Sequence, residues 1–255
     1  MGILRYKTPT YLQHKILFEL CEELFELGQN TVRLINANSN DLSKWSKYKA
    51  FLSLLLFRNT NAFSGFLILC NEGQNTNSEC LLRVMIESFI TMKFVQSNKE
   101  DLAEKFMLSG VITIKRLHGD NLDRIDKIDP QWKGDYEKLK GNYPNERFWS
   151  GKNIQQMAAA GGTLDEYEVF YRILSDRAHP TATSFFNYFE ETPNGGIFKL
   201  QEDLSDLDST LSSAFMFYYR IIDEVKNEFQ TNQEEEFNKI WKKFQMIENS
   251  KKKQG

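Results

Sequence analysis

The sequence predicts an all-α fold, a single-domain helical bundle with long central antiparallel helices. Glycine (14) and proline (5) are scarce over 255 residues, and few turn-forming residues mean few connections, which favours long helices over many short strands. Apolar residues recur at the helical period through several long segments. Because no internal repeat or shift in composition marks a boundary, we expect one domain over residues 1–250 and a disordered basic tail at 251–255.

The first two segments predict one amphipathic helix and one buried helix. Residues 10–37 carry leucine and isoleucine side chains at helical spacing, as an amphipathic helix does. Residues 42–72 are apolar on most sides, which is typical of a central, buried helix. The polar run at 58–61 divides this segment into two apolar pieces that are each too short to span a bilayer, so no membrane association is expected.

A third helix is expected over residues 77–96. The connection before it, at 73–75, is short, and short connections join antiparallel neighbours, so the second and third helices should pack side by side. Thr76 and Glu79 form the pattern of a capping box at the start of this helix. These two helices are therefore predicted to form the centre of the bundle.

One polar stripe crosses the otherwise apolar third helix, where Glu79, Arg83, Glu87 and Thr91 recur every four residues. Charged groups among apolar neighbours are costly to bury unless they are paired, so we expect Arg83 and Glu87 to be largely buried and to have partners. Two arrangements remain open. Arg83 and Glu87 pair with each other within the helix, or both face a polar seam on a later helix around residues 172–179.

The second half of the chain predicts further helices separated by one long irregular segment. Residues 118–152 are polar, rich in aromatic residues and irregular, and the run Thr-Pro-Asn-Gly-Gly at 192–196 is a turn. The helix before residue 162 should be closed by two successive glycines. Apart from the segment at 165–180, the expected helices cover residues 99–117, 153–160, 181–189, 202–231 and 234–247.

Charge, cysteine and histidine content narrow the function classes. The formal net charge is −3 and the pI is about 5.8, whereas a general nucleic-acid binder normally has a basic surface excess. The three cysteines are widely spaced and form no CxxC pair, so buried free thiols are expected rather than a metal or redox site. His14 and His118 stand alone in the sequence and are expected at the surface or at helix ends. No signal peptide is recognisable, so cytoplasmic residence is expected.

The segment at residues 165–180 concentrates the side chains that carry chemistry. Wound as an α-helix, it places Arg172, Ser175, Asp176 and His179 on one side, because positions three, four and seven residues apart lie on the same face. The following proline disfavours helical geometry at His179, so the imidazole should lie at the helix end, where the helix dipole favours its protonated form. A cation, a hydroxyl, a carboxylate and an imidazole are thus in register.

A second candidate surface lies in the irregular segment before that helix. Lys133, Lys138, Lys140 and Arg147 are interleaved with aromatic residues and followed by Trp149, and basic and aromatic side chains together are typical of surfaces that bind single-stranded nucleic acid. Packing of the aromatic side chains over an edge of the core is the alternative interpretation of this segment.

Several short motifs resemble a known bacterial family. They are Phe57-Arg58-Asn59-Thr60, Cys70-Asn71-Glu72-Gly73, Leu82-Arg83-Val84-Met85-Ile86-Glu87, Phe148-Trp149-Ser150, Met157-Ala158 and Tyr171-Arg172-Ile173-Leu174-Ser175-Asp176-Arg177-Ala178-His179-Pro180. In this order they are similar to the helical family catalogued as DUF5677, over roughly residues 54–188. The resemblance implies a helical fold, and the family has no assigned activity.

A second resemblance is to HEPN domains, helical bundles that include metal-independent ribonucleases of toxin and antiviral systems. Their signature is an arginine followed after four to six residues by a histidine, and six residues separate Arg172 from His179. HEPN enzymes usually carry a polar residue directly after the arginine, whereas Ile173 stands there in this chain. The resemblance implies a homodimer that cleaves single-stranded RNA without a metal or another cofactor, as a toxin or an antiviral-defence effector.

Under this hypothesis each polar residue of the segment has a role. Arg172 would bind the scissile phosphate through its planar guanidinium, and His179 would act as general acid or base for attack by the neighbouring 2′-hydroxyl. Asp176 or Ser175 would orient one of these two groups. No metal site is expected, because the sequence contains neither a Cys/His cluster nor grouped carboxylates at the spacing of a di-metal site.

Two other function classes compete with the ribonuclease. In a non-catalytic helical scaffold or sensor that binds a protein partner or a small ligand, Arg172 and Asp176 would form an ordinary ion pair and His179 would be a helix-end residue. A Ser-His-Asp hydrolase is disfavoured, because Ser175, Asp176 and His179 lie too close along one helix to build a triad, and no nucleophile elbow is present. The ribonuclease and the scaffold remain as the two alternatives.

Overall fold

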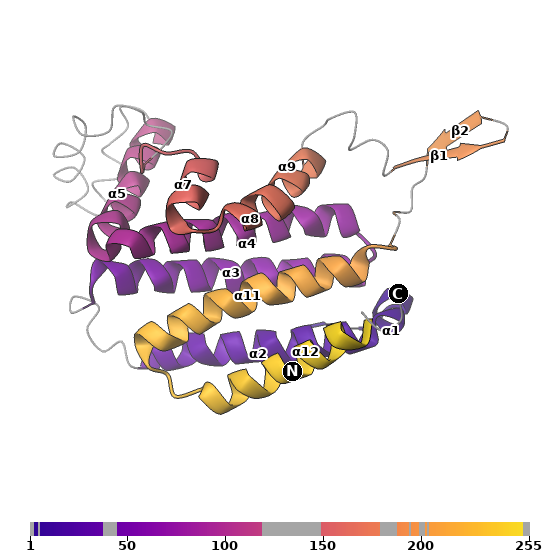
Figure 1. The fold of residues 1–255 in the computed structure, drawn as a ribbon, viewed down its shortest axis with the longest axis horizontal. Helices are drawn as coiled ribbons and strands as arrows, with labels where there is room; N and C mark the ends of the chain where they lie inside the picture. The colour runs from indigo at the N-terminus through magenta and orange to yellow at the C-terminus, as the bar shows by residue number, and fades with distance from the viewer. Residues whose placement is uncertain are drawn as a thin grey trace. The chain divides into compact units, whose positions relative to one another are not determined.

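Within the described residues the chain is helical apart from one two-stranded β-hairpin, so the prediction of an all-α fold is confirmed (Figure 1). The computed structural model describes residues 3–4, 6–37, 45–118, 149–178, 188–193, 195–198, 202 and 204–251. The elements in chain order are α1 (Pro9–Gln13), α2 (Lys15–Ala37), α3 (Lys47–Asn71), α4 (Asn75–Val95), the short 3-10 helix η2 (Gln96–Asn98), α5 (Lys99–His118), α7 (Ile154–Gly161), α8 (Leu164–Glu166), the π-helix η4 (Tyr167–Tyr171), α9 (Arg172–Ala178), β1 (Phe189–Thr192), β2 (Gly195–Phe198), α11 (Leu207–Phe229) and α12 (Glu234–Lys251).

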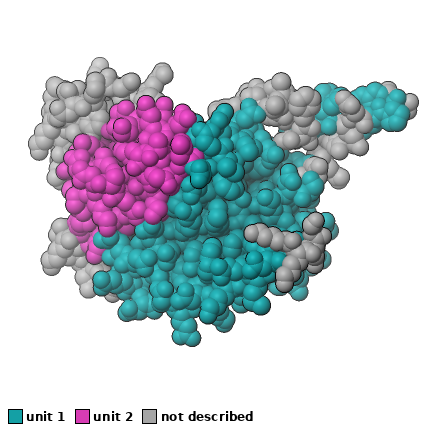
Figure 2. Space-filling model, viewed as in Figure 1, with its two compact units in different colours: residues 1–40, 53–89, 165–255 teal, residues 41–52, 90–164 magenta. Residues whose placement is uncertain are grey.

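The chain divides into two compact units, drawn in different colours in Figure 2. The first unit contains residues Met1–Asn40, Ser53–Phe89 and Asp165–Gly255, and the second contains Asp41–Leu52 and Ile90–Leu164. Helices α3 and α4 each contribute residues to both units. That the chain acts as a single domain stays a prediction.

Within the first unit, α3 and α4 run antiparallel, as the short connection between them predicts (Figure 1). The chain reverses at Gly73, which adopts a left-handed φ of 72°. Its N–H donates to the carbonyl of Cys70 (3.0 Å) and the next N–H, of Gln74, donates to Leu69 (2.9 Å), the pattern of a Schellman motif. Farther along the pair, a Cβ atom added to Gly65 would lie 3.0 Å from Leu81 Cδ1, so the two helices are in contact.

The core of the first unit is rich in aromatic side chains. Phe63 on α3 is fully buried and stacks on Tyr218 of α11, with ring centroids 4.4 Å apart. The hydroxyl groups of Tyr218 and Thr60 lie 2.9 Å apart and share a hydrogen bond, which satisfies both polar atoms inside the core. Burial raises the pKa of Tyr218, so the phenol stays neutral.

Helix α2 packs against both α11 and α12. The approach to α11 is closest at Gly28, where an added Cβ atom would lie 2.0 Å from the phenolic oxygen of Tyr218 and 3.2 Å from Ile222 Cδ1. A side chain larger than hydrogen therefore cannot be accommodated at Gly28 without moving the buried Tyr218 ring.

Gly28→Ala is expected to destabilise the protein by about 1–3 kcal/mol, because an added methyl group in a well-packed contact displaces its neighbours. Gly110 on α5 provides the matched control, since a Cβ atom added there meets nothing within 4 Å. Gly110→Ala is expected to stabilise the protein by roughly 0.5–1 kcal/mol, because alanine has the higher helix propensity. Denaturant unfolding of both variants tests the opposite signs, and equal effects would contradict the close approach at Gly28.

The turn predicted at residues 192–196 forms the tip of the β-hairpin. Strand β1 pairs antiparallel with β2, and Phe189 lies opposite Phe198 with ring centroids 5.7 Å apart. The Thr192 hydroxyl hydrogen-bonds to the carbonyl of Gly195 across the turn. The predicted helix at 181–189 is wrong at Phe189, because this residue pairs in a strand, while residues 181–187 lie outside the described residues.

In the second unit, the short helix α7 ends at the glycine pair that its sequence predicts and begins with a capping box that was not predicted. The Asn153 side chain accepts the N–H of Gln156 (2.9 Å), and the Gln156 side chain accepts the N–H of Asn153 (3.0 Å), which completes a capping box. Gly162 ends the helix with a left-handed φ of 70°. The glycine-closed helix is therefore confirmed.

Among the described residues, one helix, α3, is long and apolar enough to cross a membrane by length and composition. Of its most apolar 18-residue window, 56% is buried inside the protein. Core helices of soluble proteins are often as long and as apolar, so the length and composition of α3 fit a buried core helix as well as a membrane-spanning one. That the chain does not associate with a membrane stays a prediction.

The cysteines differ in exposure. Cys21 and Cys70 are buried free thiols as predicted, and burial raises the pKa of Cys70 to about 12. Cys80 is exposed, so the prediction of a buried thiol is wrong there. It points outward from α4, and its Sγ atom donates to the carbonyl of Thr76 one turn earlier (3.7 Å).

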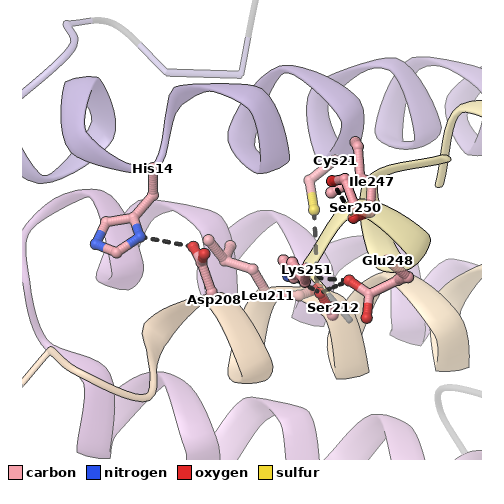
Figure 3. A network of polar contacts seen from close by, with 9 residues as sticks. All are labelled: His14, Cys21, Asp208, Leu211, Ser212, Ile247, Glu248, Ser250 and Lys251. Carbon is pink, nitrogen blue, oxygen red and sulfur yellow. Dashed lines mark hydrogen bonds and ion pairs between the residues drawn. The ribbon is translucent and has the colours of Figure 1, made fainter. Parts of the chain in front are cut away.

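Lys251 is the last residue of α12 and not part of a disordered tail, which corrects the predicted boundary. Its ammonium group donates to Ser212 (3.1 Å) and to Glu248 (2.9 Å), as drawn in Figure 3. A cation in the last turn also interacts favourably with the helix dipole. Residues 252–255 lie outside the described residues.

Candidate functional site

Two residues of the polar stripe of α4, Glu79 and Arg83, contact the helical segment formed by η4 and α9, all within the first unit. Arg83 donates a hydrogen bond to the hydroxyl of Tyr171 (3.0 Å), and its guanidinium lies 5.0 Å from the centroid of the same ring. About two helical turns after Tyr171, Arg177 forms an ion pair with the buried carboxylate of Glu79. Two charged residues of the stripe are thus used to hold the η4–α9 segment.

The predicted pairing within α4 is absent, because among the described residues no ion pair joins Arg83 to Glu87. The alternative, in which Arg83 and Glu87 face the later helix, matches the contact of Arg83 alone, and Glu79 rather than Glu87 forms the ion pair with that segment. The expectation that Arg83 and Glu87 are largely buried is wrong, since both are only half-buried. The Nε atom of Arg83 is nevertheless buried, while its Nη2 atom donates to Tyr171.

Tyr171 is the residue of this seam that sequence reasoning missed. It is buried, and burial raises its pKa, an effect to which the Glu87 carboxylate adds and which the Arg83 hydrogen bond opposes. Its ring stacks on Tyr167 with centroids 5.5 Å apart. The signal was present in the sequence, because Tyr171, Leu174 and Ala178 recur at helical spacing and mark the inner face of the segment.

The segment is not a continuous α-helix, which corrects the predicted helix at 165–180. Residues Tyr167–Tyr171 form a π-helix, and the N–H of Arg172 donates to the carbonyl of Tyr167, five residues earlier. A π-helical turn inserts about one extra residue into the backbone register and occurs frequently at functional sites. After it, α9 carries Arg172, Ser175 and Asp176 on one regular α-helical turn.

Arg172 lies on the solvent side of α9. Its side chain is 64% exposed and forms an ion pair with Glu168. Ser175 is half-buried and Asp176 is exposed. The structure therefore places these three residues on neighbouring turns, while His179 lies outside the described residues, so their predicted roles stay predictions.

Apolar side chains flank Arg172 on this exposed surface. Val169 is 55% exposed and Ile173 is 52% exposed. The η4–α9 segment instead turns Tyr171 and Leu174 inward, and the opposite side faces solvent. A basic side chain between exposed apolar residues is typical of surfaces that contact another molecule.

Of the predicted nucleic-acid surface, only Trp149 lies among the described residues. It is half-buried in the second unit, where its ring lies 5.2 Å from that of Phe106 in an edge-to-face contact and 5.9 Å from that of Phe94. These contacts match the alternative in which the aromatic side chain packs over a core edge. Nothing is described for Lys133, Lys138, Lys140 or Arg147.

A model of the family of unknown function DUF5677 matches residues 49–197, which is more than half of the chain. This chain belongs to the DUF5677 family. The family match extends from α3 to the β-hairpin and includes both partners of the Arg83–Tyr171 contact. No curated protein and no solved structure matches the chain, so the DUF5677 assignment describes the family and leaves the activity open.

His14 lies at a different place in the first unit of this DUF5677 protein, at the break between α1 and α2. Its side chain is only 10% exposed, and its Nδ1 atom lies 2.6 Å from a carboxylate oxygen of Asp208 on α11 (Figure 3). The helix-end position confirms the prediction, but the histidine is paired and not isolated. In the described part of the chain, no group of three or more His, Cys, Asp or Glu side chains is arranged to hold a metal ion.

Proposed function

We propose that this DUF5677 protein is a metal-independent endoribonuclease of the HEPN type. Arg172 binds the scissile phosphate, and His179 transfers protons during attack by the adjacent 2′-hydroxyl. Asp176 or Ser175, on the same face, orients one of these two groups. The observation that supports the proposal most directly is the exposed guanidinium of Arg172, held in place on α9 by the carboxylate of Glu168.

The pair between Arg172 and Glu168 is compatible with phosphate binding. An exposed ion pair four residues apart on a helix contributes little to stability, so a phosphate displaces Glu168 at little cost. The planar guanidinium offers five N–H donors in a fork that matches two phosphate oxygens. Arg83 and Arg177 already form contacts between α4 and the η4–α9 segment. Arg172 is therefore the better candidate for binding a phosphate.

The exposed side chains of Val169 and Ile173 support the dimeric form of the proposal. In HEPN enzymes the site is usually composed across a two-fold interface, and these apolar residues lie on both sides of Arg172 along the chain. A second protomer would bury them and bring a second Arg172 toward the first site. The proposal includes action in the cytoplasm, as a toxin or an antiviral-defence effector.

The test is cleavage of single-stranded RNA by the purified protein in the presence of EDTA. The products should carry 2′,3′-cyclic phosphate ends, because the 2′-hydroxyl is the nucleophile. The matched control is the same sequence with 2′-O-methyl groups, which cannot supply that nucleophile and should remain intact. Cleavage of the control, or cleavage that stops when EDTA is added, would exclude the mechanism.

A non-catalytic scaffold is the second candidate, and one observation favours it. Arg83 and Arg177 serve structural contacts, and Arg172 has an acidic partner within its own helical segment. In that case the exposed surface around Val169 and Ile173 binds a protein partner or a small ligand. The absence of cleavage for a broad set of RNA sequences, with a stably folded protein, would favour this function.

A further inference from the structure

Helix α3 carries a row of exposed apolar side chains along its outer side, in the part of the helix that belongs to the first unit. Leu54 is 50% exposed, Ile68 is 44% exposed and Phe57 is 37% exposed. The other residues between 54 and 68 that are not buried are Arg58, Asn61, Ser64 and Gly65. This side of α3 therefore has one charged residue over four turns, whereas the solvent-facing side of a helix normally carries charged and polar residues.

Helix α4 extends the apolar surface. A Cβ atom added to Gly65 would lie 3.0 Å from Leu81 Cδ1, so Leu81 borders the row directly. Val84 lies three residues farther along, on the same side of α4, and both side chains are half-buried. A contiguous exposed apolar surface of this kind marks a site of interaction with another molecule. We call the row of α3 and these two residues of α4 the α3 face.

The side chains of the α3 face are arranged symmetrically about Asn61. Leu54 and Ile68 each lie seven residues from Asn61, and Phe57 and Gly65 each lie four residues from it. At 3.6 residues per turn, steps of seven and four residues end roughly 20° and 40° from the starting direction, so all five residues share one side of the helix. If an identical helix lies antiparallel with Asn61 on the two-fold axis, Leu54 of one copy is level with Ile68 of the other. Phe57 is then level with Gly65.

We propose that the α3 face binds a second copy of this chain across a two-fold axis at Asn61. An isologous interface must be complementary to itself, and the symmetric order of large and small residues meets this condition. The Phe57 ring lies opposite a residue without a side chain, and the carboxamides of the two Asn61 residues can donate to and accept from each other. Arg58 is level with Ser64 of the other copy, so no like charges meet.

A lipid bilayer is the competing occupant, because α3 is long and apolar enough to cross a membrane by length and composition. The central position of Asn61 favours the second copy. In hydrocarbon its carboxamide would have no hydrogen-bond partner, whereas on the two-fold axis it meets its own copy. The α3 face shares no residue with the surface around Val169 and Ile173 and does not depend on the ribonuclease. If both surfaces bind a second copy, the protein is a tetramer.

The experiment is analytical ultracentrifugation of the full chain up to about 100 μM, a range that detects micromolar dissociation constants. The parent should associate. Leu54→Glu and Ile68→Lys should each weaken the association by about tenfold or more, because each places a charge against an apolar side chain. Combining the two substitutions should restore association, because each introduced carboxylate is then level with an introduced ammonium group of the other copy. Leu12→Glu, at a 61% exposed leucine of α1, is the matched control and should associate as the parent does.

A cross-linking measurement tests the position of the two-fold axis. With the exposed Cys80 replaced by serine, Asn61→Cys should form an intermolecular disulfide under mild oxidation, because a residue on a two-fold axis lies next to its own copy. Arg33→Cys, at an exposed residue of α2, is the control in the same background and should form far less of the cross-linked dimer.

Three results would overturn the proposal. The first is a parent that stays monomeric up to about 100 μM. The second is association that Leu54→Glu leaves unchanged, and its loss in Ile173→Glu would then assign the dimer to the η4–α9 surface of the proposed ribonuclease. The third is a monomer that binds phosphatidylcholine vesicles and loses this binding in Leu54→Glu, which would assign the α3 face to lipid.

Discussion

Replacing Arg172 or His179 by alanine is expected to abolish RNA cleavage while leaving the fold intact. Loss of a phosphate-binding cation or of a general acid or base lowers the rate about 100-fold or more. Arg172 is 64% exposed and its pair with Glu168 is a surface pair, so Arg172→Ala should leave the free energy of unfolding nearly unchanged. Cleavage rates and thermal melts of the same preparations give the two measurements.

A variant that combines Arg172→Ala with His179→Ala tests this prediction further. When two residues act as one catalytic unit, removing both costs little more than removing either, so the double variant should cleave no more slowly than the single ones. Arg33→Ala is the matched control, because Arg33 is an exposed arginine on α2 whose guanidinium donates to Asn30, three residues earlier (2.8 Å). It should retain full activity. A fall in the Tm of both catalytic variants, with no cleavage by the parent, would assign these residues a structural role.

Phe63→Ala is expected to have the largest effect on stability among the substitutions considered. Phe63 is fully buried and stacks on Tyr218, so truncation removes the transfer free energy of the ring and leaves a cavity. The expected loss is about 3–5 kcal/mol, which for a chain of this size corresponds to a fall in Tm of roughly 6–20 °C. Denaturant unfolding and calorimetry measure both quantities.

Phe198→Ala is the control with the same chemical change. Phe198 is 78% exposed on strand β2, so its truncation removes little buried apolar area. The free energy of unfolding should change by less than about 1 kcal/mol. Similar losses for the two variants would show that Phe63 does not lie in the cooperative core of the first unit.

The helices of this protein were largely predictable because helix formation follows a local pattern. Apolar side chains at a period of 3.6 residues predicted α2, α3, α4, α11 and α12. Most of the described helix ends lie within a few residues of their predicted positions. The glycine pair after α7 predicted its end, since a left-handed residue closes a helix. The antiparallel pairing of α3 and α4 followed from their short connection.

The candidate site was predicted in part. The four-residue spacing of Glu79, Arg83 and Glu87 placed them on one face of α4. In the structure Arg83 and Glu79, and not the predicted pair Arg83 and Glu87, form the hydrogen bond and the ion pair with the later helical segment. The partners were not predictable. Tyr171 and Arg177 meet the stripe only because two helices about 90 residues apart in sequence pack in one particular register, which no local pattern specifies.

The sequence by itself determined the helical class, the central helices and the set of charged residues that need partners, because periodicity and capping act between residues a few positions apart. Only the tertiary structure decided the start of α4, the π-helix at Tyr167–Tyr171 and the outward direction of Arg172. Glu202 reaches the N–H of Thr76 across 126 residues and replaces the local capping box. Such choices depend on the free energy of packing whole helices together, which local propensity does not contain.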